Sequence, residues 1–238
     1  MKTTNEHHVP VITIDGPSGT GKGTISHRLA RHLGWHYLDS GAIYRVLAWV
    51  AVQKQIDFSD VDALVSLALH LNLSFEVDEH CDSQVYLDGQ NISELIRTEA
   101  CGQNASKIAV TPEIRAALLE RQRAFAVSPG LVTDGRDMGT IVFPEADLKL
   151  FLYASVEERA HRRFLQLKNK QNDDNLAEVT IQLAERDARD SKRAHAPLKP
   201  AENAIQVDTT HLSIDQVSDQ VFDLVMKSDI RSYVVGEK

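Results

Sequence analysis

"GPSGTGKGT", residues 16–24, follows residues 9–14, a short apolar run rich in β-branched side chains. The pattern Gly16-x4-Gly21-Lys22 matches the first seven positions of a phosphate-binding loop, and a strand before it with a helix after it makes the match credible. Its glycines let backbone N–H groups approach phosphate oxygens, the helix start adds positive potential, and Lys22 reaches the bridging and terminal oxygens. The stretch therefore predicts a nucleoside triphosphate site.

Position 23 departs from the usual pattern. Gly23 stands where most such loops carry the hydroxyl that binds Mg²⁺, and that hydroxyl is displaced to Thr24. Because Mg²⁺ dehydrates reluctantly, phosphate oxygens and water can hold most of it. We expect Mg²⁺ as the cofactor that accompanies the nucleotide, with any protein contact near Thr24 and Asp134. The displaced hydroxyl also speaks against a switch GTPase, which uses that ligand to sense the γ-phosphate.

Length and composition indicate one soluble enzyme-sized domain. A chain of 238 residues suits a single α/β domain with an inserted subdomain, and 42% hydrophobic with 25% charged residues is ordinary globular usage. No apolar run approaches a bilayer span, so we expect a cytoplasmic protein. The net charge of -8 argues against broad nucleic-acid or membrane binding, whereas 15 Arg against 11 Lys favours local, bidentate phosphate recognition.

Strands and helices alternate along most of the chain, which predicts a parallel sheet covered on both faces with ligands outside the carboxyl ends of its strands. A change to two-residue periodicity predicts a small antiparallel sheet of about three strands at residues 72–93. The expected strands of the main sheet are 9–14, 130–134, 148–153 and 204–208. The expected helices are 21–33, 41–53, 61–71, 93–110, 112–127, 155–166, 177–193 and 213–226. Residues 168–175 are expected to form a loop.

Several charged side chains are expected near the phosphate loop. A helix that begins just after residue 40 should point Arg45 into the cleft. Asp134, Arg136 and Asp137 lie at or just beyond the end of a predicted strand, which places a carboxylate near any metal and a guanidinium near a transferring phosphoryl group. The plainer alternatives are a capped helix start with a solvated arginine, and a turn stabilised by aspartate side chains.

Two further segments, 158–163 and 185–193, are rich in arginine and flank a polar stretch. On a helix, Arg186, Arg189 and Arg193 lie three and four residues apart and so share one face. A solvated face with i,i+3 ion pairs is the usual reason for such a run. Beside a triphosphate loop, phosphate recognition is the stronger interpretation.

The chain resembles the nucleoside monophosphate kinases, and most closely the bacterial cytidylate kinase family of P-loop kinases, from about residue 9 to 226. The motifs that carry the resemblance are DGPSGTGKGT (15–24), LDSGAIYR (38–45), DGRDMGT (134–140), EERAHRR (157–163) and ERDARDSKRAHAPL (185–198). The resemblance implies a P-loop NTPase-type sheet with a small β insert and a short lid. We therefore expect one core at 9–230, interrupted by an acceptor-binding insert at 72–105 and a lid at 163–178, with a tail at 231–238.

The resemblance also implies transfer of the γ-phosphoryl group of ATP to CMP or dCMP, giving ADP and CDP or dCDP. The implied ATP-binding residues are Gly16, Pro17, Ser18, Gly19, Thr20, Gly21, Lys22, Gly23, Thr24 and Arg159. The implied catalytic residues are Lys22, Arg136, Arg162 and Arg193. The implied CMP-binding residues are Arg45, Arg136 and Arg193 at the phosphate, Ser40, Arg115 and Asp137 at the base, and Ser106, Arg186 and Asp190 at the sugar.

Other functions stay open at this point. A uridylate/cytidylate, adenylate or shikimate kinase would share the fold, although shikimate kinases are shorter and adenylate kinases usually lack DGRDMGT. A non-catalytic nucleotide-binding regulator would not explain two arginine clusters besides Lys22. We expect a monomer whose partners are ATP and CMP or dCMP, with no nucleic acid or membrane partner; the sequence does not fix the preference between CMP and dCMP or the tolerance for UMP.

Overall fold

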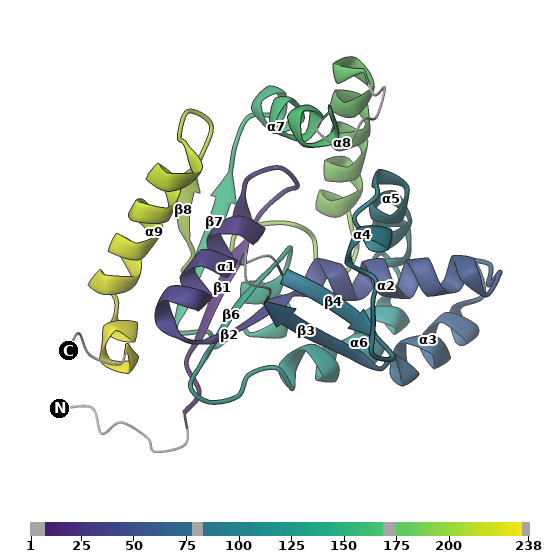
Figure 1. The fold of residues 1–238 in the computed structure, drawn as a ribbon, viewed down its shortest axis with the longest axis horizontal. Coiled ribbons are helices and arrows are strands. Elements are labelled where there is room, and N and C mark those ends of the chain that lie inside the picture. The colour runs from purple at the N-terminus through teal and green to yellow at the C-terminus, as the bar shows by residue number, and fades with distance from the viewer. Residues whose placement is uncertain (1–7, 78–82, 169–174, 235–238) are drawn as a thin grey trace.

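The protein, seen in a computed structural model, is described for residues 8–77, 83–168 and 175–234 (Figure 1). Within these residues the main sheet has five strands, all parallel, in the order β2-β6-β1-β7-β8. Their bounds are β1 Val11–Asp15, β2 His36–Asp39, β6 Leu131–Gly135, β7 Leu148–Tyr153 and β8 Ile205–Asp208. This sheet, with the phosphate loop directly after its central strand, confirms the predicted P-loop α/β class.

Helices cover both faces of the sheet. Their bounds are α1 Lys22–Leu33, α2 Ser40–Gln53, α3 Val61–His70, α4 Ser93–Ile96, α5 Glu99–Ile108, α6 Pro112–Arg123, α7 Val156–Lys168, α8 Leu176–Ser191 and α9 Ile214–Lys227, with a π-helical turn η1 at Met138–Val142 and a 3₁₀ turn η2 at Asp229–Tyr233. Among the described residues, none of these helices combines the length and the apolar character needed to cross a bilayer.

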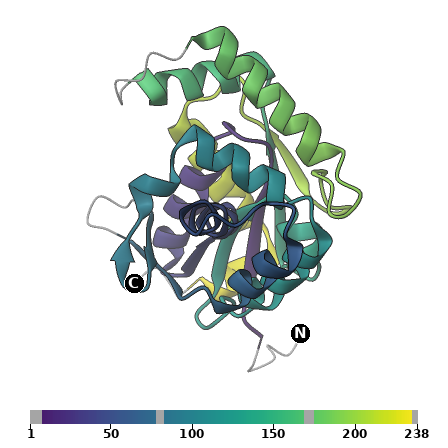
Figure 2. The ribbon, with the colours of Figure 1, turned by 90° about the vertical axis from the view of Figure 1, so that its right-hand side faces the viewer.

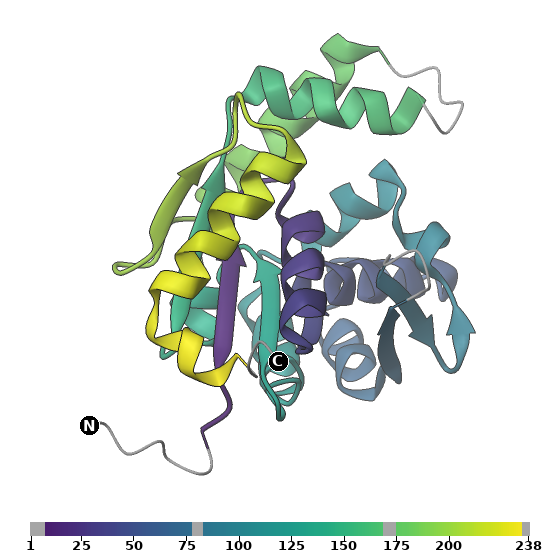
Figure 3. The same cartoon turned by 60° about the vertical axis from the view of Figure 1, so that its left-hand side comes forward.

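The strands send alternate side chains into two hydrophobic layers. Ile12 and Ile14 of β1 pack in a layer with α1 and α9, and Figure 3 shows α9 lying across the strands on that side. Val11 belongs to the opposite layer, which contains side chains of α2, α3, α5 and α6. Because both faces are covered, substrates can approach the strands only at an edge, and the carboxyl ends carry the loops of such folds.

The predicted small antiparallel sheet is present, with strand order β3-β4-β5 and bounds Leu73–Val77, Ser83–Leu87 and Gln90–Asn91. Its hairpin turns at Asp88 and Gly89, which both have positive φ (50° and 77°), as a tight hairpin of this type requires. Helices α7 and α8 lie side by side beyond the carboxyl ends of the main strands (Figures 1 and 2). The domain bounds 9–230, 72–105, 163–178 and 231–238 stay predictions, and residues 78–82, 169–174 and 235–238 lie outside the described residues.

Strand β2 was not predicted from the sequence. It has four residues, lies at the edge of the sheet, and begins two residues after Gly34 ends α1 in a left-handed conformation (φ 66°). Its residues pair with β6, so that His36 lies opposite Leu131. Such a short strand carries too little periodicity to be separated from the neighbouring helices by pattern alone.

The helix predicted at residues 93–110 is two helices, α4 and α5, and this part of the prediction was wrong. Thr98 adopts an extended conformation, and its hydroxyl accepts a hydrogen bond from the backbone N–H of Cys101 (3.2 Å), which caps α5. The break turns the carbonyls of Ile96 and Thr98 toward α2, although the Thr98 carbonyl also accepts the backbone N–H of Gly102 at 3.1 Å. Arg45 donates to both, at 2.8 and 3.0 Å, so the interruption creates an anchor for a predicted site residue.

Gly130, at the entry to β6, lies against the buried ring of Trp35. A Cβ atom at position 130 would come within 2.4 Å of that ring. Trp35 is part of the hydrophobic layer of α1 and α9, so its ring has little room to withdraw. The glycine is therefore required by packing between β6 and the end of α1.

We predict that Gly130→Ala lowers the free energy of unfolding by about 1–3 kcal/mol, the usual cost of overpacking a filled core. Urea denaturation measures this loss. Trp35→Leu removes the ring that causes the overlap, so Gly130→Ala should cost much less in that background. Equal costs in the two backgrounds would contradict this account of the packing.

Candidate active site

A cleft of about 340 Å³ lies at the carboxyl edge of the main sheet. It is lined by the phosphate loop, the residues that follow β2 and β6, and side chains from α2, α5, α6, α7 and α8. Seven basic and five acidic side chains line it, so the cleft is locally positive although the whole chain carries -8. A locally positive cleft in an acidic protein favours small anions over an extended polyanion.

The phosphate loop has the backbone that its sequence predicts. Gly16, Gly19 and Gly21 have φ values of 151°, 82° and 85°. A Cβ atom at Gly16 would lie 2.1 Å from the carbonyl oxygen of Leu152, so no larger residue fits there. Helix α1 begins at Lys22 with no side-chain cap and no acidic residue in its first turn. Its first N–H groups and its dipole are therefore available to an anion.

Lys22 is buried at the start of α1 and donates to the carbonyl of Pro17 at 3.1 Å. Burial and the charge of Arg136 lower the pKa of Lys22, and the nearby Asp134 opposes this shift. Conversely, burial and Asp39 raise the pKa of Asp134, while Lys22 opposes it. A bound phosphate would add negative charge beside Lys22 and so favour its protonated form.

Tyr37, on the unpredicted strand β2, donates its hydroxyl to Asp134 at 2.6 Å. This hydrogen bond leaves Asp134 oriented beside the phosphate loop. Asp134 lines the cleft together with Asp39 and the exposed Thr24. Among the described residues, no group of three or more acidic, histidine or cysteine side chains is arranged to bind a metal ion. This small oxygen-donor set fits Mg²⁺ that keeps most of its water and phosphate ligands, and it does not fit an all-protein metal cage.

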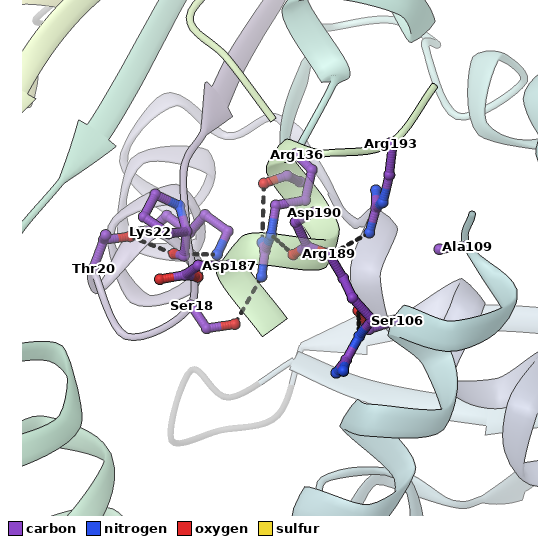
Figure 4. A network of polar contacts seen from close by, with 12 residues as sticks. Ser18, Thr20, Lys22, Ser106, Ala109, Arg136, Asp187, Arg189, Asp190 and Arg193 are labelled. Carbon is purple, nitrogen blue, oxygen red and sulfur yellow. Dashed lines mark hydrogen bonds and ion pairs between the residues drawn. The ribbon is translucent and has the colours of Figure 1, made fainter. Parts of the chain in front are cut away.

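Asp190 of α8 is the centre of a polar network (Figure 4). Arg136 donates to it at 2.9 Å, Arg193 forms an ion pair with it, and Ser106 donates at 3.2 Å. Although its burial acts in the opposite direction, Arg136, Arg193 and Arg186 lower the pKa of Asp190 to about 2. Arg136 also donates to the hydroxyl of Ser18 at 2.7 Å, so one guanidinium joins the phosphate loop to α8.

Asp15, at the end of β1, fixes the loop that carries Arg136. Its carboxylate accepts hydrogen bonds from the backbone N–H groups of Met138 (2.9 Å) and Gly139 (2.8 Å), the first residues of η1. Burial raises the pKa of Asp15 to about 6 even though these two donors oppose it. Sequence reasoning gave Asp15 no role of its own, because its partners lie more than 120 residues away.

Gly102 of α5 lets two arginines approach the helix backbone. A Cβ atom at this position would lie 2.8 Å from Nη2 of Arg45 and 3.2 Å from Nη1 of Arg186. Burial, followed by the charges of Arg136 and Arg45, lowers the pKa of Arg186 to about 9. These buried like charges favour an anion in the cleft. Nothing in the sequence pattern marked Gly102, because its importance depends on side chains from α2 and α8.

The third part of the cleft is built around an ion pair between Arg115 of α6 and Asp137. The guanidinium of Arg115 also lies over the ring of Tyr44, 5.7 Å from its centroid. Burial raises the pKa of Asp137, and Arg115 opposes that shift. Ser40, the first residue of α2, is buried, lines the cleft and lies one helical turn before Tyr44.

The structure brings most of the predicted residues to this one cleft. The predicted residues that line it are Ser18, Gly19, Gly21, Lys22, Gly23, Thr24, Ser40, Arg45, Ser106, Arg115, Asp134, Arg136, Asp137, Arg186, Asp190 and Arg193. Gly16, Pro17 and Thr20 belong to the backbone turn beneath it. Lining residues that the prediction omitted include Glu99 and Arg163, which form an ion pair at 3.1 Å. The motif EERAHRR could have suggested Arg163.

Arg159 and Arg162 of α7 do not line the cleft. Arg159 is buried, donates to the carbonyl of Ser18 at 3.1 Å and pairs with Asp187 at 2.6 Å. Arg162 donates to Thr209 at 3.2 Å, in the segment between β8 and α9. Their predicted roles near ATP stay predictions. Helix α8 also ends at Ser191, so Arg193 lies in the turn after the helix and not on the face predicted for it.

Comparison with known proteins identifies the family. The family described as cytidylate kinase matches residues 12–227. The cytidylate kinase of Edwardsiella ictaluri is 56% identical over 209 residues, covering 88% of this chain and 92% of the relative. That of Colwellia psychrerythraea is 52% identical over 216 residues, covering 91% and 96%. These matches confirm the resemblance carried by the five motifs, and the chain belongs to the cytidylate kinase family.

Proposed function

We propose that the cleft binds ATP at the phosphate loop and CMP or dCMP among the arginines, and transfers the γ-phosphoryl group between them. The activity follows from membership of the cytidylate kinase family. The contacts of Arg136 give the best support for this division of the cleft, because its guanidinium contacts both Ser18 of the phosphate loop and Asp190 of α8. From this position the guanidinium could bind a donor phosphate and an acceptor phosphate at the same time.

On the donor side, the N–H groups of the loop and the start of α1 hold the ATP phosphates, with Lys22 near the transferring group. Mg²⁺, when bound with ATP, neutralises charge on the phosphate oxygens. Asp134, oriented by Tyr37, accepts hydrogen bonds from water near Thr24. Arg159 and Arg162 neutralise the outer ATP phosphates in this proposal. Each must then exchange an acidic partner, Asp187 for Arg159 and Glu158 for Arg162.

On the acceptor side, Arg45, Arg136 and Arg193 hold the phosphate of the monophosphate. Ser106, Arg186 and Asp190 contact the sugar. The acceptor phosphate is already an anion, so no general base is needed. The catalytic task is to hold two anions in line while charge spreads over the transferring group, and buried guanidiniums are suited to it.

The base is bound by Ser40, Arg115 and Asp137. Cytosine presents acceptors at O2 and N3 beside an amino donor at N4, so an arginine and a carboxylate are complementary to it. The Arg115–Asp137 ion pair places these two groups side by side. Uracil has a donor at N3 and an acceptor at O4, so the carboxylate would face O4 without a hydrogen bond. A cytoplasmic location and a monomeric state stay predictions from the sequence.

The direct test is a coupled assay of ADP formation with ATP and each of CMP, dCMP, UMP, AMP and shikimate. We predict that CMP and dCMP give the highest kcat/KM.

Lys22→Ala should lower kcat roughly 10²–10³-fold with every acceptor, because it removes a donor that acts on the transferring group. The exposed Lys54, outside the cleft, provides the control Lys54→Ala. Equal activity with AMP or shikimate would contradict the proposal.

A second prediction concerns the base. Asp137→Ala should lower the ratio of kcat/KM for CMP over UMP roughly tenfold to hundredfold, because one charged hydrogen bond to the amino group is lost and the repulsion of O4 is relieved. Steady-state kinetics with both acceptors measure the ratio. If CMP and UMP lose activity in equal proportion, Asp137 does not read the base.

A further inference from the structure

A buried glutamine stands behind the proposed base-binding residues. Gln122 of α6 is 1% exposed and does not line the cleft. Its side-chain oxygen lies 2.7 Å from the hydroxyl oxygen of Ser40, which is itself 3% exposed and does line the cleft. The two residues are separated by 82 positions in the chain, so no short sequence motif could have predicted this contact.

The contacts of Gln122 fix the direction of this hydrogen bond. Its amide nitrogen lies 3.3 Å from the carbonyl oxygen of Leu118. A carbonyl can only accept, so the amide nitrogen belongs on that side and the amide oxygen faces Ser40. The amide oxygen in turn can only accept. Ser40 must therefore donate its single proton to Gln122.

This direction determines what Ser40 offers to a substrate. A hydroxyl has one donor and two acceptor positions, and here the donor is used inside the protein. The oxygen of Ser40 can then only accept a hydrogen bond from a group in the cleft. An amino group satisfies it, whereas a carbonyl oxygen brings two lone-pair-bearing atoms together without a proton between them.

We infer that Gln122 is a positioning residue that sets the choice of cytosine over uracil by orienting the hydroxyl of Ser40. The inference rests on the proposed function, in which Ser40 and Asp137 bind the base, and it adds that the Ser40 hydroxyl faces position 4 of the base beside Asp137. With Gln122 in place, the Ser40 hydroxyl and the carboxyl group of Asp137, which pairs with Arg115, both present acceptors to the N4 amino group of cytosine. Without Gln122, the Ser40 hydroxyl is free to turn and donate to O4 of uracil. The preference for cytosine then weakens because UMP becomes a better substrate.

The test is Gln122→Met, which keeps the length of the side chain and removes its acceptor. We expect kcat/KM for UMP to rise and that for CMP to change little, so that the CMP/UMP ratio falls at least roughly fivefold. A loss shared equally by both acceptors would show a merely structural role and overturn the inference, as would an unchanged ratio. If Gln122→Met does not fold, as judged by thermal denaturation, Gln122→Leu makes the same test.

Two controls separate the orientation of Ser40 from packing. Leu118→Met changes the packing of α6 one turn away and keeps the backbone carbonyl that the Gln122 amide contacts, so it should leave the ratio unchanged. In a Ser40→Ala background, Gln122→Met should have no further effect on the ratio, because the hydroxyl that it orients is gone. A fall of similar size in either control overturns the inference.

Failure of the inference can be told from failure of the proposed function. If the unaltered protein phosphorylates neither CMP nor dCMP, the proposed function is wrong. If it prefers CMP to UMP and Gln122→Met keeps that preference, the proposed function stands and only the role of Gln122 is lost.

Discussion

The ion pairs of one buried carboxylate, Asp190, are the interaction on which the cleft depends. They hold Arg136, which follows β6, beside Arg193, which follows α8, and Arg136 also contacts Ser18 of the phosphate loop. Burying several guanidiniums together is unfavourable unless acidic groups and hydrogen bonds offset the cost. The five acidic residues of the cleft leave part of the positive charge uncompensated, and that remainder is what a substrate phosphate would neutralise.

The fold places these charges by interrupting its regular elements. Glycines with positive φ form the phosphate loop, and the break between α4 and α5 exposes the carbonyls that anchor Arg45. Asp15 binds the first N–H groups of η1 and so fixes the loop that bears Arg136 and Asp137. Arg45 and the loop of Arg136 are thereby held in place before a substrate binds. Such preorganisation lowers the cost of ordering side chains when a substrate binds.

Sequence reasoning reached the parts of this protein that short contiguous segments encode. The phosphate loop, the parallel sheet, the small antiparallel sheet and the family all rest on local patterns, and all are confirmed. Strand β2 and the division of residues 93–110 were missed, because a four-residue edge strand and a break stabilised by Arg45 carry weak local signals. Tyr37, Gly102 and Gln122 were missed for a related reason: each acts through a partner distant in sequence.

The most direct test of the account is the affinity of the protein for CMP compared with cytidine, measured by titration calorimetry at one fixed, low salt concentration. CMP should bind at least about a hundredfold more tightly than cytidine, because charge-assisted hydrogen bonds to a phosphate are each worth about 1.5–3 kcal/mol. Similar affinities for the two would contradict it, since the buried arginines would then not be holding the acceptor phosphate.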